Sequence, residues 1–166
     1  MVSVAESRRE EVLRWLEEVK DPEVPVLSIR ELGVLRDVEV SDDSVVVVMT
    51  PTYSGCPAMH AMEAEVLQTL ARHGVPNAQV RTVYSPAWTT DWMSSEAKAK
   101  LEAYGIAAPT RVEADDLVPL RRRAPVPCPY CRSTNTTMRS EFGSTACKAI
   151  LFCNNCHQPF ELFKPI

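Results

Sequence analysis

Cysteines are the residues of this chain whose spacing points most directly to chemistry, and four of the six form two C-x-x-C pairs. The pairs are Cys128/Cys131 and Cys153/Cys156, with 21 residues between them. A two-residue spacer in a tight turn points both sulfurs to the same side, so two such turns complete a tetrahedron of thiolates. The spacing predicts a zinc ribbon whose four ligands leave no open catalytic position. Iron, alone or in an iron–sulfur cluster, would use the same ligands.

The segment around these pairs is short, which makes a bound metal more important for its folding. Residues 136–152 can supply strands that bring the two turns together, with Gly143 at the bend. A module spanning residues 127–166 is too small for a self-sufficient apolar core, so metal binding is expected to supply its folding free energy. His157 directly follows the last cysteine and is predicted to be a surface residue rather than a fifth ligand.

Cys147 lies inside the same segment, in the stretch FGSTACK, but outside the two pairs. One interpretation is a buried thiol on a strand. The other is a second, exposed thiol whose pKa the neighbouring Lys148 could lower.

Cys56 stands apart from the other cysteines, in TPTYSGCPAMHAM at residues 50–62. Pro57 suits the first turn of a helix because its missing N–H would have no partner there, which places Cys56 at or next to the N-cap. The helix end would stabilise a thiolate through its free N–H groups and partial positive charge. Gly55 permits a sharp turn and leaves room near the sulfur. The alternative is an inert cysteine buried at a strand end, and the local sequence leaves the two open.

Apolar periodicity predicts the elements that position Cys56. Helices are expected to end near Lys20, to run from Pro57 to Gly74, and to run from Ser94 or Ser95 to Gly105. Strands are expected over 34–40, 44–50 and 78–85, the first two as a hairpin. A strand, a crossover helix and another strand favour a parallel pairing. The fold class is therefore α+β, with a small mixed three-stranded sheet, about three helices and a C-terminal zinc ribbon.

Charge divides the chain into two modules. Residues 1–120 contain 20 acidic and 11 basic side chains, whereas residues 121–166 contain 2 acidic and 7 basic ones. The predicted domains are an α+β domain over 1–105, a linker over 106–126 and the ribbon over 127–166. The basic tail, with arginines at 121–123, invites a nucleic-acid interpretation, but few aromatic residues are spaced for base stacking and the footprint is weak.

Composition narrows the remaining classes of function. An apolar fraction of 45% with 24% charged residues is typical of a soluble globular protein. Without an 18-residue apolar run or a signal-peptide core, we expect a cytoplasmic protein with no membrane partner. The chain has no nucleophile elbow and no glycine-rich phosphate loop, so no catalytic residues are predicted.

Several stretches together resemble a known family. DPEVPVLSIRELGVLRDVEV (21–40), TPTYSGCP (50–57) and SPAWTTDWMSSEAKAKL (85–101) are similar to the iron–sulfur-assembly domain family that includes SufT. The tail CPYC…FGSTACKAILFCNNC…PFELFK resembles that of one bacterial branch, the D subunits of phenylacetate degradation. The resemblance implies a non-catalytic accessory protein of the phenylacetyl-CoA oxygenase (1,2-phenylacetyl-CoA epoxidase). The implied partners are its di-iron subunit or its reductase subunit, which holds flavin and an iron–sulfur cluster.

The resemblance also implies roles for individual residues. Cys56, together with Cys147, would handle iron or an iron–sulfur cluster transiently, and zinc would be structural. One thiolate rarely holds a cluster alone, so a homodimer or a partner's ligands are implied. The family's motifs also match Asp21, Glu23, Trp88, Asp91 and Trp92. Some of these residues have a structural interpretation as well: Asp21 would end a helix, and the two tryptophans would be core or interface aromatics. The alternative function is a purely structural adaptor of the same complex.

Overall fold

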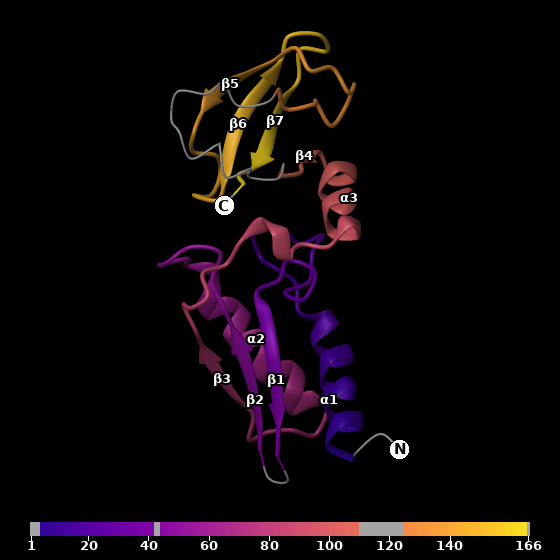
Figure 1. Cartoon of the computed structure of the whole chain (residues 1–166), viewed down its shortest axis with the longest axis vertical. Helices are drawn as coiled ribbons and strands as arrows, with labels where there is room; N and C mark the ends of the chain where they lie inside the picture. Colours follow the sequence, from indigo (N-terminus) through magenta and orange to yellow (C-terminus); the bar gives the residue numbers. More distant parts are fainter. Residues whose placement is uncertain (1–3, 42–43, 110–124, 166) are drawn as a thin grey trace. The chain divides into compact units, whose positions relative to one another are not determined.

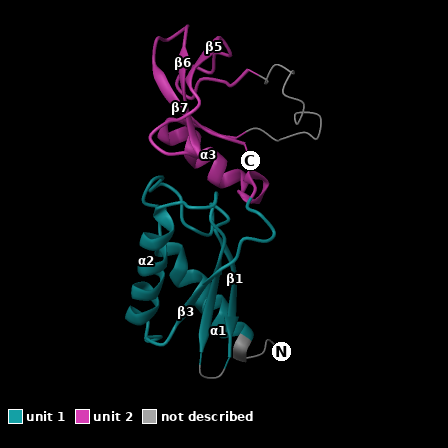
Figure 2. Ribbon diagram, turned by 90° about the vertical axis from the view of Figure 1, so that its left-hand side faces the viewer, with its two compact units in different colours: residues 1–88 teal, residues 89–166 magenta. Residues whose placement is uncertain are grey.

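The computed structural model describes residues 4–41, 44–109 and 125–165. The chain forms two compact units, Met1–Trp88 and Thr89–Ile166, drawn in different colours in Figure 2. Most of the predicted linker, including the arginines at 121–123, lies outside the described residues. No helix within the described ranges combines the length and apolar character needed to cross a membrane.

A three-stranded mixed sheet is the centre of unit 1 (Figure 1). Its strands are β1 (Leu35–Val40), β2 (Val45–Met49) and β3 (Gln79–Thr82), in the order β1-β2-β3. β2 pairs antiparallel with β1 and parallel with β3. An uninterrupted apolar run such as VVVVM suits a strand that is covered on both faces, because successive side chains point to opposite faces of the sheet. The predicted hairpin and mixed sheet are confirmed.

Two helices complete unit 1. α1 (Val4–Trp15) continues into the short η1 (Leu16–Glu18) and packs against β1, while α2 (Ala58–Arg72) connects β2 to the parallel β3. α2 ends as predicted, with Gly74 in the left-handed conformation (φ +84°). The core joins fully or almost fully buried side chains from these helices and from β2: Val12, Leu16, Val47, Met49, Met62 and Leu70.

Unit 2 is built on a four-stranded sheet of order β4-β7-β6-β5. β5 (Thr136–Ser140), β6 (Lys148–Cys153) and β7 (Pro159–Phe163) form an antiparallel meander. β5 and β6 confirm the strands predicted between the cysteine pairs, whereas β7 follows the second pair and lies outside that prediction. Before this meander come η2 (Thr90–Trp92), α3 (Ser95–Tyr104) and β4 (Ile106–Ala107). β4 pairs in parallel with β7 at the sheet edge.

The ends of α3 follow the sequence signals. The Ser94 hydroxyl accepts the N–H of Ala97 at 3.0 Å, and Gly105 ends the helix with φ +93°. The sequence predicts that the first domain ends at residue 105, whereas the chain divides into its two compact units between residues 88 and 89. The reason lies in Ile106 and Ala107, which are apolar, buried and paired with β7. The boundaries 1–105, 106–126 and 127–166 stay a prediction about independently folding domains.

Candidate metal centre and reactive thiols

Two turns with the same hydrogen-bond pattern hold the ribbon cysteines. In the first, Cys128 accepts the N–H of Arg132 at 2.9 Å and donates its own N–H to Ser133 at 2.9 Å. In the second, Cys153 makes the equivalent bonds to His157 and Gln158, both at 3.0 Å. We call these turns, residues 128–133 and 153–158, the first and second knuckles.

The residue after each second cysteine explains how the knuckles close. Arg132 and His157 have φ values of +62° and +59°, the left-handed conformation that reverses the chain within one residue. His157 thus supports the turn through its backbone, and its exposed side chain is not among the clustered ligands of the described residues. The prediction of a surface histidine is confirmed.

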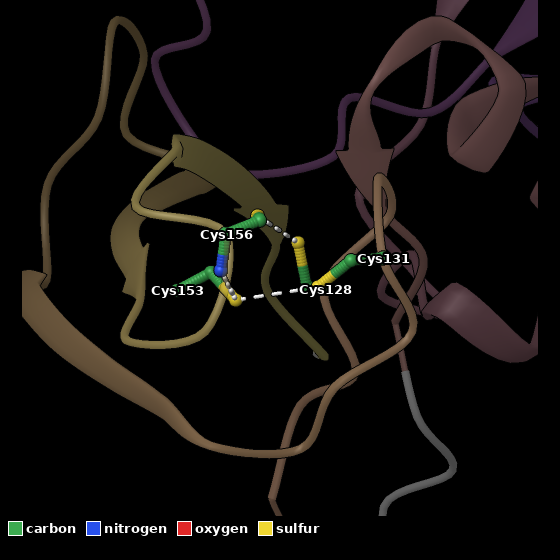
Figure 3. Close-up of side chains that lie close together, drawn as sticks. All are labelled: Cys128, Cys131, Cys153 and Cys156. Carbon is green, nitrogen blue, oxygen red and sulfur yellow. Dashed lines mark hydrogen bonds between the residues drawn. The ribbon is translucent and has the colours of Figure 1, made fainter.

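The knuckles bring Cys128, Cys131, Cys153 and Cys156 together, so that all four sulfurs lie within 4.8 Å of one another (Figure 3). The Sγ–Sγ distances are 3.7 Å for Cys128–Cys156 and 3.5 Å for Cys131–Cys153. Four ligands about 2.3 Å from a zinc ion at tetrahedral angles would have sulfurs about 3.8 Å apart. Both the donor set and its spacing fit zinc, and iron–sulfur chemistry uses the same donors.

Hydrogen bonds and burial shift the pKa values of two of these thiols in opposite directions. The backbone N–H of Ser133, followed by the Asn155 side-chain amide, lowers the pKa of Cys131 to about 6. The backbone N–H of Gln158 also favours the thiolate of Cys156, but burial and the neighbouring sulfurs outweigh it and raise that pKa to about 12. Four thiolates this close need a cation, so metal binding will displace protons from the cluster.

The metal site is continuous with the core of the ribbon. Cys128 and Cys153 have no exposed surface, while the second cysteine of each knuckle is partly buried. The two buried ligands pack in one apolar cluster with these residues: Ala107, Ala149, Leu151, Phe160 and Leu162. The metal ligands therefore form part of the core of unit 2.

Cys56 lies immediately before Pro57, the N-cap residue of α2. Its carbonyl accepts the N–H of Met59 at 3.3 Å, and Gly55 before it has φ +89° with open space where a Cβ would stand. The strand-to-helix turn is therefore as predicted. The cysteine is 8% exposed, which leaves a small accessible area beside a helix N-terminus.

The neighbours of Cys56 in sequence are divided between core and solvent. Thr50 and Thr52 are buried, and the Thr50 hydroxyl has no hydrogen-bond partner among the described residues. His60 is almost fully exposed and lies 3.8 Å from Glu63. In the same unit, Asp21 accepts backbone N–H groups from Glu23 and Val24, which fixes the turn that follows the first helix.

Cys147 is buried just before β6, and its sulfur lies 3.0 Å from the Thr145 hydroxyl. Lys148 forms an ion pair with Glu161 at 3.0 Å, although its side chain is only 4% exposed. Burial opposes ionisation of Glu161, but the N–H and hydroxyl of Ser144 and the Lys148 ammonium keep its pKa below the usual value. Sequence reasoning missed this buried pair; its only signal was a lysine beginning the apolar strand KAILFC.

The structure gathers four of the six predicted cysteines, and within the described ranges neither Cys56 nor Cys147 belongs to that metal-binding group. Cys56 lies in unit 1 and Cys147 in unit 2. The burial of Cys147 agrees with the strand-thiol interpretation.

Comparisons with known proteins divide the chain in a similar way. A family model described as an iron–sulfur cluster assembly protein matches residues 9–84, and one described as a PaaD zinc beta ribbon domain matches residues 113–164. The first range contains Cys56, and the second contains the other five cysteines.

Relatives of known sequence cover either one module or both. An Escherichia coli protein, provisionally named as the D subunit of 1,2-phenylacetyl-CoA epoxidase, is 40% identical over 100% of this chain and 98% of its own. The Fe–S protein maturation auxiliary factor YitW of Bacillus subtilis is 38% identical over 58% of this chain and 95% of its own. A crystal structure of a domain of unknown function from Bacillus anthracis is 31% identical over 58% of this chain and 93% of that one, with a TM-score of 0.55.

The fold and the cysteine set define a class of two-module proteins in which an iron–sulfur-assembly domain is followed by a zinc ribbon. Because the full-length relative spans both modules, the chain belongs to the PaaD family, the D subunits of the phenylacetyl-CoA epoxidase system.

Proposed function

We propose that this protein is a non-catalytic maturation factor of the phenylacetyl-CoA epoxidase and acts in the cytoplasm. Its task would be to assist assembly of an iron or iron–sulfur centre in the di-iron or the reductase subunit. The observation that carries the proposal is the full-length likeness to the epoxidase D subunit of Escherichia coli, combined with the likeness of residues 9–84 to maturation factors.

Cys56 is the thiol proposed to handle the metal. It is the one cysteine within residues 9–84, so a thiol function of that domain falls on it. It lies directly before the first turn of α2 and has a small accessible area. The thiol would lose its proton to solvent and bind iron as the thiolate.

A single thiolate needs help to hold a metal or a cluster. Among the described residues of unit 1, no second cysteine accompanies Cys56, and Cys56 does not belong to a metal-binding group. A second copy of the chain or ligands of the recipient protein would complete the coordination. Cys147 is a less accessible second thiol because it is buried.

The ribbon is proposed to bind the partner protein. Its four cysteines satisfy one zinc ion without an open position, so the metal would stabilise a surface rather than react. Half-exposed aromatic side chains such as Tyr130 are common at the centres of protein interfaces.

A structural adaptor is the second candidate, and the burial of Cys56 favours it. With 8% of its surface exposed, this cysteine could serve only to pack the strand-to-helix turn. The adaptor would bind the oxygenase through the ribbon and leave metal delivery to other proteins.

Substitution of Cys56 separates the two candidates. In cells that depend on the epoxidase, Cys56→Ala removes the thiolate but keeps a small apolar side chain. The maturation function predicts that the purified oxygenase and reductase lose iron and activity, measured by metal analysis and single-turnover assays. His60→Ala is the matched control, because it removes an exposed side chain one turn away.

A loss of iron and activity can be assigned to the missing thiol only if the Cys56→Ala variant is folded. Equal thermal midpoints and zinc contents for Cys56→Ala and the parent chain would show an intact fold. If the oxygenase and reductase isolated with a folded Cys56→Ala variant hold full iron and activity, the maturation function is wrong and the adaptor remains.

A further inference from the structure

Within unit 2, the C-terminal end of α3 and the strand β4 contact the zinc ribbon at three places. These contacts are an ion pair, a close packing of backbone on a tyrosine ring, and a strand pairing. All three involve a knuckle or the core that contains the metal ligands.

One partner of the ion pair is Arg132, the residue that closes the first knuckle. Arg132 donates from Nη1 to Oε2 of Glu102 on α3 at 2.6 Å. Both side chains are more than a third exposed, so the pair contributes little to stability by itself. Its geometry nevertheless depends on the left-handed backbone of Arg132, which exists only when the knuckle is closed.

The tightest contact lies between Gly105 and Tyr130. Tyr130 stands between the ligands Cys128 and Cys131, and a Cβ on Gly105 would lie 2.8 Å from its hydroxyl and 3.3 Å from two ring carbons. The left-handed φ of +93° favours glycine here, and an added Cβ would also push against the far end of the Tyr130 side chain. Tyr130 belongs to the first knuckle, and its ring lies against the last turn of α3.

The strand pairing continues this contact into the core. Ile106 pairs with Glu161 and Ala107 with Leu162 of β7. Ala107 also belongs to the apolar cluster that contains Cys128 and Cys153. A change at the metal site thus acts on β4 without an intermediate layer.

We propose that zinc binding orders α3 and β4 together with the ribbon, so that the metal-dependent unit begins well before the first cysteine. α3 has ten residues, a length at which a helix is marginal in water without packing partners. The contact of Tyr130 with Gly105 couples the knuckle to the helix. An open pocket of about 330 Å³, between Ala103 and Tyr104 on one side and Pro129 and Tyr130 on the other, is then present only in the metal-bound chain.

Hydrogen exchange of the full chain tests the proposal directly. The zinc-loaded protein is compared with protein stripped of metal by a chelator under reducing conditions. Amides of α3 should exchange about tenfold faster or more without zinc, because the helix loses its packing. Amides of the β1–β2 hairpin in unit 1 serve as the internal reference and should be unchanged.

A pair of glycine variants tests the coupling from the other side. Gly105→Ala and Gly74→Ala both place a side chain at a left-handed helix end, but only Gly105 meets Tyr130, whereas Gly74 has open space. Coupling between sites is reciprocal in binding free energy, so Gly105→Ala should bind zinc at least about fivefold more weakly than Gly74→Ala in an equilibrium competition with a chelator.

Either of two results overturns the proposal. The first is that α3 amides of the metal-free chain exchange as slowly as in the zinc-loaded chain. The second is that Gly105→Ala and Gly74→Ala bind zinc with the same affinity. The first comparison needs no variant, so a Gly105→Ala protein that fails to fold still leaves the proposal open to refutation.

Discussion

In unit 1 the buried side chains are mainly aliphatic and come from the helices, from β1 and β2 and from the segment 19–34, whereas in unit 2 two metal ligands are themselves core residues. The single cysteine of unit 1 stands at the edge of a finished core, but the clustered cysteines of unit 2 help to form theirs. Under the proposed function, the thiol of unit 1 would serve exchangeable chemistry. Thiols that a fold depends on are kept for a permanent metal.

Loss of a metal ligand should produce the largest difference between the units. Cys153→Ser removes a fully buried ligand, and structural zinc contributes about 10–16 kcal/mol to the folding of small metal modules. We expect zinc content to fall to zero and the amides of β5–β7 to exchange freely, while β1–β3 stay protected. Cys56→Ala should keep its zinc. A protected ribbon without zinc would contradict this comparison.

Truncation of an aliphatic core side chain should destabilise unit 1 and leave unit 2 unchanged. Leu70→Ala on α2 removes a fully buried side chain and should lower the free energy of unfolding of unit 1 by about 2–5 kcal/mol. Leu67→Ala, on the same helix but 39% exposed, should change it by less than about 0.5 kcal/mol. Hydrogen exchange of the amides in each unit, followed through a denaturant titration, measures the free energy of unfolding of both variants. Equal losses in the two units would show that the cores are not independent.

The ion pair of Lys148 with Glu161 should give a smaller, pH-dependent effect confined to unit 2. Glu161→Gln removes the carboxylate that pairs with the buried ammonium and should cost about 1.5–3 kcal/mol at pH 7. The folded pKa of Glu161 is lowered, so its stabilisation is complete above the unfolded pKa, about 4.3, and is lost as pH falls through the folded pKa.

Thermal midpoints of zinc-loaded protein at several pH values measure this pair. The difference between parent and Glu161→Gln should be constant near neutral pH and should narrow in acid. Glu141→Gln changes an exposed carboxylate of the same unit and is the matched control. A difference that widened on acidification would have the wrong sign for a lowered carboxyl pKa.

The smallest expected effect is at the start of α3. Ser94→Ala removes the hydroxyl that accepts the Ala97 N–H and should cost about 1 kcal/mol. Ser95→Ala changes the next residue, which is exposed, and should be neutral within about 0.5 kcal/mol. Exchange of α3 amides detects both. If the two substitutions have equal effects, the capping bond does not stabilise α3.

Much of unit 1 could be predicted because its signals are local and repeated. The apolar run of β2 and the period of α2 each extend over several residues, so single exceptions do not hide them. β3 is shorter than predicted, Gln79–Thr82 instead of 78–85, because strand length depends on the partner available for pairing. The burial of Cys56 depends in the same way on neighbours distant in the chain.

The sequence by itself determined the metal-ligand set and the helix ends. Each knuckle closes through bonds within six residues, and Ser94, Gly74 and Gly105 act within a single turn, so short spacing contains the whole signal. Only the tertiary structure decided that α3 and β4 join the ribbon and that Lys148 is buried with Glu161. Those contacts link residues 13 to 55 positions apart, and no local pattern specifies which distant partner will complete a packing or a charge.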